Sequence, residues 1–349
     1  MRVVVVGATG NVGTSLIESL GEEPEVESIL GVARRLPGWR PAKTEWAVAD
    51  MGSDDLVDLF RGADVVVHLA WLFQPTHDPV TTWRANALGG IRVFQAVADA
   101  GVPALVYASS VGAYSRGPKD RAVDESWPTN GWPTAGYTRE KAYLERVLDT
   151  FEHENPDRRV VRIRPGFIFK KESASEQRRL FAGPLLPQRL VRAGLVPVLP
   201  ELRELRVQAL HAADAGEAFR LATVRPVHGA FNVASEPVLD SSSLARLLGA
   251  RTVPTPTGLI RAGLAGAWHL HLVPAAPQLF DAVLGLPIMD TSRARTELGW
   301  MPRYSSTQAV SELIEGLREG SGKDTPPLAA QTSGPARVND LRTGVGERP

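Results

Sequence analysis

Residues 1–13 read MRVVVVGATGNVG, a short apolar run that breaks into glycine at positions 7, 10 and 13. The run Val3–Val6 is β-branched and uninterrupted, which is typical of a strand buried on both faces of a parallel sheet. The residues that follow, Thr14–Leu20, have the pattern of a helix. A strand that turns at glycine into a helix N-terminus presents unpaired N–H groups and the positive end of a helix dipole. The stretch therefore predicts a phosphate-binding turn.

Glycine suits such a turn because a Cβ would hold a pyrophosphate away from the backbone or push the helix from the strand. The spacing Gly-x-x-Gly-x-x-Gly is one residue longer at its front than the commonest dinucleotide fingerprint. We expect a dinucleotide to bind here, and the alternative is a turn with a structural role alone. The binding residues that we predict in the turn are Gly7, Thr9, Gly10, Asn11, Val12 and Gly13.

Composition narrows the class of protein. The 39 basic residues balance 39 acidic ones, so the chain lacks the basic excess that nucleic-acid binding requires. There is no cysteine, which excludes disulfides, zinc–thiolate sites and cysteine nucleophiles. The first strand starts at the N-terminus without the pattern of a signal peptide, so we expect a cytoplasmic protein.

The most apolar late stretch is residues 258–289. It is interrupted by Arg261, His269, His271, Pro274, Pro277, Asp281 and Pro287. These interruptions argue against a membrane span. We expect buried helices of a second lobe, and the alternative is a surface that meets lipid or a hydrophobic partner.

Strand and helix patterns alternate up to about residue 170, which indicates a doubly wound α/β fold around a parallel sheet. The expected strands are Val3–Val6, Ser28–Ala33, Thr44–Ala49, Val65–Leu69, Ala104–Ala108 and Val160–Ile163. The expected helices are Thr14–Leu20, Asp54–Leu59, Thr82–Ala100 and Thr138–Asn155. We assign residues 1–170 to a nucleotide-binding domain to which later segments return.

After residue 170 the alternation is lost, and residues 171–318 predict a smaller, mixed substrate-binding lobe. Its expected elements lie near Gln208–Ala222, Ala230–Ala234, Leu244–Leu248 and Ser305–Arg318. Residues 319–349 are rich in glycine, proline, serine and threonine, which predicts a disordered C-terminal tail.

Tyr137 and Lys141 form a Tyr-x-x-x-Lys pair at the start of a helical pattern, and Ser110 follows the strand expected at 104–108. Residues four apart share a helix face, so Lys141 should lie one turn from Tyr137. A phenol with a pKa of about 10 is a poor acid or base at neutral pH, and a nearby ammonium would lower that pKa. A serine hydroxyl near both could hold a carbonyl or alcohol oxygen for hydride transfer. The alternative is an ordinary amphipathic helix start.

Together with the glycine turn, these residues resemble the extended short-chain dehydrogenase/reductase superfamily, in its NAD-dependent epimerase/dehydratase family, over roughly residues 1–318. Further motifs that carry the resemblance are Ala49-Asp50, His68-Leu69-Ala70, Asn86, Ser110–Tyr114, Arg164-Pro165-Gly166, His211–Asp214 and Ser292–Trp300. The resemblance implies a Rossmann-type fold and NAD(P)-dependent chemistry at a hydroxyl/carbonyl centre. It implies no metal.

The resemblance also implies roles for individual residues. Ser110 matches the catalytic serine or threonine, Tyr137 the general acid/base, and Lys141 the residue that binds the nicotinamide ribose and tunes the tyrosine. Further cofactor contacts are implied for Asp50, Met51, Leu69, Ala70, Asn86 and Pro165. His211 and Asp214 match a structural motif of the second lobe.

The end of the second expected strand bears on the choice of nicotinamide cofactor. An acid there bonds the ribose 2′-hydroxyl of NAD, whereas arginine accommodates the 2′-phosphate of NADP. This sequence has Ala33 followed by Arg34 and Arg35, so we favour NADP, with NAD as the alternative. The arginines could instead be solvated loop residues.

The substrate stays open between two classes. The loop Trp71–Phe73 is unusually apolar for a pocket border, and Trp83, Trp127 and Trp132 could lie near it, which favours an apolar or aromatic substrate. Cations that could instead bind the diphosphate of a sugar nucleotide are Arg178, Arg179, Arg189, Arg192 and Arg206. The hypotheses are an oxidoreductase, a nucleotide-sugar epimerase or dehydratase, and a cofactor-binding regulatory protein. The expected partner is a small molecule, with a homodimer left open.

Overall fold

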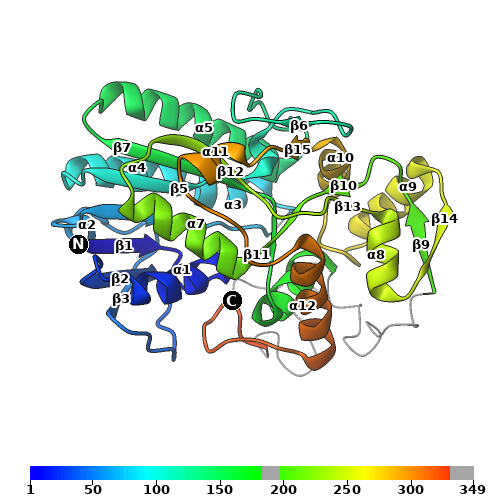
Figure 1. Ribbon diagram of the computed structural model, residues 1–349, viewed down its shortest axis with the longest axis horizontal. Coiled ribbons are helices and arrows are strands. Elements are labelled where there is room, and N and C mark those ends of the chain that lie inside the picture. Colours follow the sequence, from blue (N-terminus) through cyan, green and yellow to red (C-terminus); the bar gives the residue numbers. More distant parts are fainter. Residues whose placement is uncertain (75, 183–196, 331–349) are drawn as a thin grey trace.

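The computed structural model describes residues 1–74, 76–182 and 197–330. Its core is a seven-stranded sheet in the order β12-β7-β5-β4-β1-β2-β3, and each neighbouring pair is parallel (Figure 1). The strands are β1 (Arg2–Val6), β2 (Ser28–Ala33), β3 (Thr44–Val48), β4 (Val65–His68), β5 (Ala104–Ala108), β7 (Arg159–Pro165) and β12 (Gly229–Val233). The predicted doubly wound fold is confirmed.

Helices cover both faces of this sheet (Figure 1). One face carries α1 (Asn11–Glu22) and α7 (Ala212–Val224), and the other carries α2 (Val57–Phe60), α4 (Gly89–Asp99) and α5 (Gly136–Glu154). Alternate residues of β1 show why: Val3 and Val5 belong to the hydrophobic cluster of α1 and α7, whereas Val4 and Val6 belong to that of α4 and α5. The uninterrupted valine run is therefore buried on both sides, as expected for a central parallel strand.

Strand β12 lies in a different part of the fold from the one that the sequence predicts. Residues 230–234 were expected in the second lobe, but β12 pairs with β7 at the edge of the main sheet. The preceding helix α7 also packs on this sheet, beside α1. The segment looks isolated in the sequence because its parallel partner lies more than sixty positions earlier, and no local pattern reveals such a pairing.

The remaining elements form the second lobe and the connections to it. The connections are α3 (Pro79–Trp83), η1 (Arg84–Leu88), η2 (Val111–Ala113) and β6 (Ala122–Val123). The lobe contains β8 (Phe167–Phe169), η3 (Lys171–Ser173), α6 (Ala174–Gln177), η4 (Arg178–Ala182), β9 (Val198–Glu201), β10 (Arg206–Val207), β11 (Ala209–His211), β13 (Leu239–Asp240), α8 (Ser241–Leu248), β14 (Arg251–Pro254), α9 (Thr257–His269), α10 (Pro277–Gly285), β15 (Ile288–Met289), α11 (Ser292–Thr296) and α12 (Ser306–Glu319). Of these, α11 returns to the main sheet beside β12.

Helix α9 differs from the expectation of buried helices in residues 258–289. None of its residues is fully buried, and Leu259 is 66% exposed. Helix α10, by contrast, buries Ala282 and Leu284. The prediction of burial from the apolar composition of this stretch is therefore right for α10 and wrong for α9.

The expected disordered tail is also corrected in its first part. Residues 320–330, which we call the C-terminal strap, pack on the nucleotide-binding domain. Thr325 is 2% exposed and donates a hydrogen bond from its Oγ1 to Thr9 O at 2.9 Å, and Leu328 is fully buried. Lys323 pairs with Glu18 of α1. The strap has few apolar residues, but it buries Leu328 and is also held by the contacts of Thr325 and Lys323. Residues 331–349 lie outside the described part of the chain.

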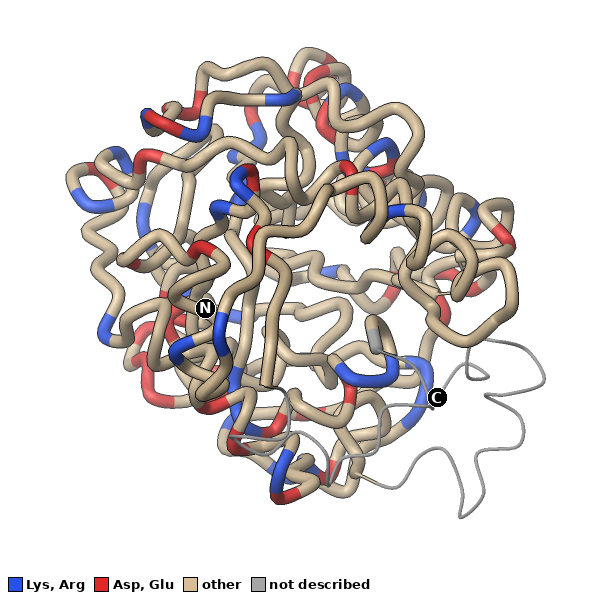
Figure 2. The backbone as a smooth tube through the Cα atoms, turned by 90° about the vertical axis from the view of Figure 1, so that its right-hand side faces the viewer, with Lys and Arg blue, Asp and Glu red and all other residues tan. Residues whose placement is uncertain are grey.

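The distribution of charge over the molecule agrees with its equal numbers of basic and acidic residues. Figure 2 shows acidic and basic residues interspersed around the outline, without a large region of one sign. Among the residues that the structure describes, no helix is long and apolar enough to cross a membrane.

Candidate active site

The glycine turn has the geometry that a dinucleotide requires. Gly7 has φ +87°, and a Cβ there would lie 2.5 Å from the backbone nitrogen of Ala70, after β4. A Cβ on Gly13 would overlap the carbonyl of Gly7. Helix α1 starts directly after the turn, and among the described residues no side chain caps its N-terminus. Gly7 and Gly13 thus allow the turn to pack closely against the chain after β4 and against the start of α1. The uncapped N–H groups of α1 are donors of the kind that bind a pyrophosphate.

The other predicted cofactor residues lie at the carboxyl edge of the sheet. They follow or end the strands β2 (Arg34 and Arg35), β3 (Asp50 and Met51), β4 (Leu69 and Ala70) and β7 (Pro165). The strands are parallel, so these positions share one edge with the glycine turn, where ligands of such sheets bind. Both arginines are exposed, which leaves them accessible to a phosphate.

Asn86 differs from the expectation of a direct cofactor contact. Its side-chain oxygen accepts a hydrogen bond from Leu72 N at 2.7 Å, and its nitrogen donates to Leu72 O at 2.8 Å and to the Glu140 carboxylate at 2.7 Å. Both amide hydrogens are thus used within the protein. Asn86 holds the loop after β4, and we call these contacts with Leu72 the Asn86 clamp.

The clamp presents two aromatic side chains to the predicted catalytic residues. Trp71 and Phe73 flank Leu72, and both contact the ring of Tyr137. Phe73 stacks on that ring at 5.1 Å between centroids, and Trp71 meets it edge-on at 5.6 Å. We call Trp71–Phe73 the aromatic loop. The aromatic loop therefore contacts the predicted catalytic tyrosine, in keeping with the prediction that it borders the site.

Ser110 and Tyr137 lie together as the sequence predicts. Tyr137, in the first turn of α5, donates a hydrogen bond from its hydroxyl to Ser110 Oγ at 2.9 Å. Ser110 Oγ also accepts one from Gly112 N at 2.9 Å. Because this oxygen accepts twice, the hydroxyl hydrogen of Ser110 is left to donate to a substrate oxygen.

Lys141 lies one turn further along α5 and is 4% exposed. Its ammonium donates a hydrogen bond to Ala108 O at 2.7 Å, and Nζ lies 3.5 Å from the centroid of the Trp71 ring. Burial lowers the pKa of Lys141 to about 7, although the carboxylates of Glu145 and Glu140 act against this shift.

The pKa of Tyr137 is shifted in the opposite direction from the one that the sequence predicts. Lys141 was expected to lower the pKa of the phenol, but burial raises the pKa of Tyr137 to about 12, and the hydrogen bond to Ser110 offsets this only in part. The aromatic loop is the physical reason, because it covers the phenol with apolar rings. In this arrangement Tyr137 holds its proton at neutral pH.

A buried ion-pair network behind the site was not predicted. Glu145 of α5 is fully buried and pairs with Arg162 and Arg164 of β7. Burial raises the pKa of Glu145, but the two guanidiniums outweigh it and bring the pKa to about 2. Ser109 Oγ donates to the same carboxylate at 2.5 Å, which fixes the segment before Ser110. Two arginines at alternate positions of a buried strand were the signal that could have revealed the network.

The tryptophans expected near the site are dispersed. Trp83 packs against Tyr143, which is 38% exposed, and Trp127 packs with Val111 and Tyr114. Trp132 lies close to Gly285 of α10. The aromatic wall of the site comes instead from the aromatic loop and from Phe181 of η4, whose ring meets that of Phe73 edge-on at 5.8 Å.

The motif His211–Asp214 is structural, as expected. His211 Nδ1 caps the N-terminus of α7 and its Nε2 lies 2.9 Å from Glu312 of α12. The Asp214 carboxylate accepts hydrogen bonds from the backbone nitrogens of Arg303 and Tyr304. The motif thus joins α7 to α12 and to the residues just before α12.

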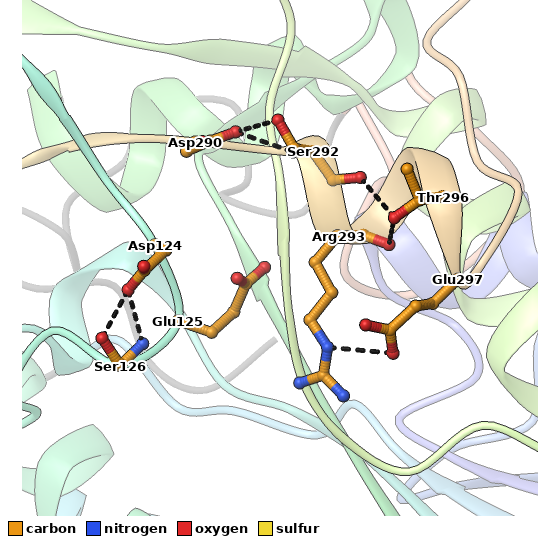
Figure 3. Close-up of a pocket in the computed structure, with 8 residues that line it drawn as sticks. All are labelled: Asp124, Glu125, Ser126, Asp290, Ser292, Arg293, Thr296 and Glu297. Atoms are coloured by element: carbon orange, nitrogen blue, oxygen red, sulfur yellow. Dashed lines mark hydrogen bonds and ion pairs between the residues drawn. The ribbon is translucent and has the colours of Figure 1, made fainter.

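A separate open hollow of about 460 Å³ lies beside β6 and α11 (Figure 3). It is lined by Asp124, Glu125, Ser126, Asp290, Ser292, Arg293, Thr296 and Glu297. Most of these side chains are bonded to one another, as in the pairs Asp124–Ser126 and Arg293–Glu297. Across the described chain, no group of carboxylates and histidines is arranged to hold a metal ion.

The glycine turn, the carboxyl edge of the sheet and the Ser110–Tyr137–Lys141 group together match one family. Its profile, NAD dependent epimerase/dehydratase family, matches residues 3–234. The chain belongs to this family. Membership confirms the resemblance that the sequence motifs carried.

Known relatives of this epimerase/dehydratase-family protein include reductases and dehydrogenases. It is 28% identical over 343 residues to the 4-hydroxy-2-methyl-3-oxo-4-farnesyl-3,4-dihydroquinoline-1-oxide ketoreductase of Stigmatella aurantiaca, covering 92% of this chain and 98% of the relative. It is 28% identical over 254 residues to a decarboxylating sterol-4-alpha-carboxylate 3-dehydrogenase of Candida albicans, covering 69% of this chain and 66% of the relative. In fold it is similar to the UDP-glucose 4-epimerase of Thermus thermophilus solved with NAD, with TM-score 0.67, 20% identity, and coverage of 91% and 99%.

Proposed function

We propose that this epimerase/dehydratase-family protein is an NADP-dependent reductase or dehydrogenase that interconverts a hydroxyl and a carbonyl on an apolar or aromatic substrate. The observation that carries the proposal is the aromatic loop, which packs the rings of Trp71 and Phe73 against the ring of Tyr137. Such a wall favours an apolar skeleton over a sugar beside the acid/base. The Stigmatella and Candida relatives are named for a farnesyl quinoline and a sterol, which have the same apolar character.

The residues divide the chemistry between them. Ser110 donates a hydrogen bond to the substrate oxygen, and Tyr137 transfers a proton to or from it. A bound nicotinamide would supply or accept the hydride. Lys141, when charged, stabilises the phenolate that Tyr137 becomes after it gives up its proton. Because Tyr137 is protonated at neutral pH, the resting site is prepared for reduction of a carbonyl.

A substrate panel with NADPH tests the proposal. We expect oxidation of NADPH with apolar ketones and none with UDP-sugars. A nucleotide-sugar epimerase or dehydratase, the second candidate, is supported by the fold likeness to UDP-sugar epimerases and would show no net turnover of cofactor. Interconversion of UDP-glucose and UDP-galactose without net turnover would replace the first candidate by the second. Binding of cofactor without either activity would favour the regulatory protein instead.

The preference for NADP rests on Ala33, Arg34 and Arg35 at the end of β2. No carboxylate stands there to repel a 2′-phosphate, and two exposed guanidiniums can bind it. We expect tighter binding of NADPH than of NADH, measured by fluorescence titration. Arg34→Ala with Arg35→Ala should reduce the preference by about 10- to 100-fold, the equivalent of roughly 1.5–3 kcal/mol.

The matched control for the double variant is Arg61→Ala. It removes an exposed arginine whose guanidinium pairs with Asp58. It should leave the ratio of the two affinities unchanged. If the double variant also leaves the ratio unchanged, the phosphate contact assigned to Arg34 and Arg35 is wrong.

A further inference from the structure

Arg178, the first residue of η4, is a buried cation whose Nε and Nη2 have no hydrogen-bond partner among the described residues. The residue is only 4% exposed. An arginine keeps its charge at any ordinary pH, so it cannot lose its proton to relieve the cost of burial. A buried charge without a partner is strongly unfavourable.

Other buried arginines show how this chain normally treats such a charge. Arg162 and Arg164 are 6% and 5% exposed, and both bond to the carboxylate of Glu145. Arg178 has a comparable degree of burial but no carboxylate among the described residues. Within the described part of the chain nothing supplies an anion to Arg178, and this contrast points to a ligand.

The neighbours of Arg178 within η4 place it at the predicted site. Arg179 donates to the carbonyls of Pro327 and Ala329 in the C-terminal strap, which lies on the glycine turn. On the other side, Leu180 O accepts from Gln74 Nε2 at 2.7 Å, and Phe181 contacts Phe73. Phe73 in turn stacks on Tyr137. The element therefore runs between the nucleotide-binding turn and the aromatic wall of the acid/base.

We propose that Arg178 binds an anionic oxygen group, a carboxylate or a phosphate, that the substrate carries. A planar guanidinium offers parallel N–H donors to two oxygens of such a group, which satisfies both unpaired nitrogens at once. The substrate would then be an apolar alcohol or ketone with an acidic group, whose ring lies on Phe73 and Phe181. This extends the proposed function, on which the identification of the ligand as the substrate rests.

The test compares thermal unfolding of the protein without ligands, in chloride and in inorganic phosphate of equal ionic strength. We expect Arg178→Met to unfold at the same or a higher temperature than the natural chain, because it removes an uncompensated charge. Phosphate should raise the melting temperature of the natural chain more than that of Arg178→Met. The general stabilisation by phosphate salts is common to both proteins and cancels in the comparison.

Arg179→Met is the matched control. It removes the neighbouring arginine with its bonds to the strap, so it should lower the melting temperature but keep the specific response to phosphate. Arg178→Gln, which keeps donors without the charge, provides the same comparison if the methionine variant does not fold. An unchanged phosphate response in the Arg178 variants would overturn the proposal, because the guanidinium would then have an internal partner.

Stabilisation by NADPH distinguishes the two sources of the anion. We expect NADPH to stabilise Arg178→Met as much as the natural chain, which leaves the anion to the substrate. If the variant loses this stabilisation, the anion belongs to the cofactor diphosphate and the assignment to the substrate is wrong. These measurements follow thermal unfolding and need no turnover. A negative result would therefore count against the role of Arg178 and not against the proposed reductase or dehydrogenase activity.

Discussion

At the scale of single residues, Tyr137 and Lys141 have pKa values displaced by the same cause. Burial under the aromatic loop raises the pKa of the phenol to about 12 and lowers that of the ammonium to about 7. Each shift favours the neutral form of its group. Between these two pKa values the neutral form of each group therefore predominates.

We expect Tyr137→Phe to reduce turnover by about 100-fold or more, because it keeps the ring against Phe73 but removes the proton that the reaction transfers. Affinity for NADPH should barely change. Steady-state kinetics and fluorescence titration measure the two effects. Tyr143→Phe is the control, since Tyr143 lies on the same helix with its ring against Trp83. Near-full activity in Tyr137→Phe would remove the acid/base role.

Lys170 gives a prediction for the pH dependence of stability. It donates hydrogen bonds to the hydroxyls of Thr14 and Ser15 in α1, and burial lowers its pKa to about 8. An unfolded lysine has a pKa of about 10.4, so between these values the unfolded chain holds a proton that the folded protein has released. The free energy of unfolding attributable to this group therefore rises with pH across that window.

Urea unfolding at about pH 8 and about pH 10 measures the effect. The natural chain should gain on the order of 1 kcal/mol more between these pH values than Lys170→Met. Lys119 and Lys141 also have lowered pKa values, but they are present in both proteins and cancel. The neighbouring Glu176, whose pKa burial raises to about 7, is ionised throughout the window. Equal gains in the two proteins would contradict the assignment.

At the scale of elements, the Asn86 clamp joins η1, α5 and the loop after β4. Glu140 of α5 accepts hydrogen bonds from Asn86 and Thr82 and is 1% exposed, so α5 positions the loop as well as the catalytic residues. The aromatic loop thus has a fixed relation to Tyr137, although it lies outside any helix or strand.

Asn86→Ala should destabilise the protein by roughly 2–4 kcal/mol, because it leaves the Leu72 backbone and the Glu140 carboxylate without partners. Turnover should fall with it, since Trp71 and Phe73 lose their support. The control is Asn155→Ala, which removes one hydrogen bond to Phe151 O at the end of α5 and should cost about 1 kcal/mol. The free energy of unfolding is measured in urea for both variants. Similar losses would show that the contacts of Asn86 contribute no more than a single hydrogen bond.

The elements that the sequence predicts best are those with local signals. The strands β1, β2, β4 and β5 agree with the expected ranges to within a residue, because each is a short apolar run bounded by turn residues. The four-residue spacing also placed Tyr137 and Lys141 correctly on one helix, and the structure brings Ser110 to Tyr137. By contrast, β12, the Glu145 network and the Asn86 clamp each join separate elements, and the hydrophobic pattern of one element does not identify its partner in another.

At the scale of the whole molecule, the C-terminal strap closes the nucleotide-binding domain from the far end of the chain. It contacts three parts of that domain: Thr9 in the glycine turn, Glu18 in α1, and Trp39 after β2, whose backbone nitrogen donates to Asp324 O. The last described residues therefore support the first ones.

Two shortened chains measure the contribution of the strap. A chain ending at Gly320 should unfold at a lower temperature than one ending at Ala330, because it loses the buried Leu328, whose burial alone contributes about 1.5–3 kcal/mol. Its affinity for NADPH should also fall, since Thr325 no longer supports the turn. Because both chains lack residues 331–349, the difference belongs to residues 321–330. Equal melting temperatures would show that the strap does not contribute to stability.

The bond between Thr325 and Thr9 spans 316 positions, nearly the whole length of the chain. On a ribosome, the glycine turn therefore emerges 316 residues before its partner in the strap. A nascent chain can pair its early strands as they appear, but this side of the turn stays uncovered until the strap has been synthesised. The turn is thus completed much later than it is made.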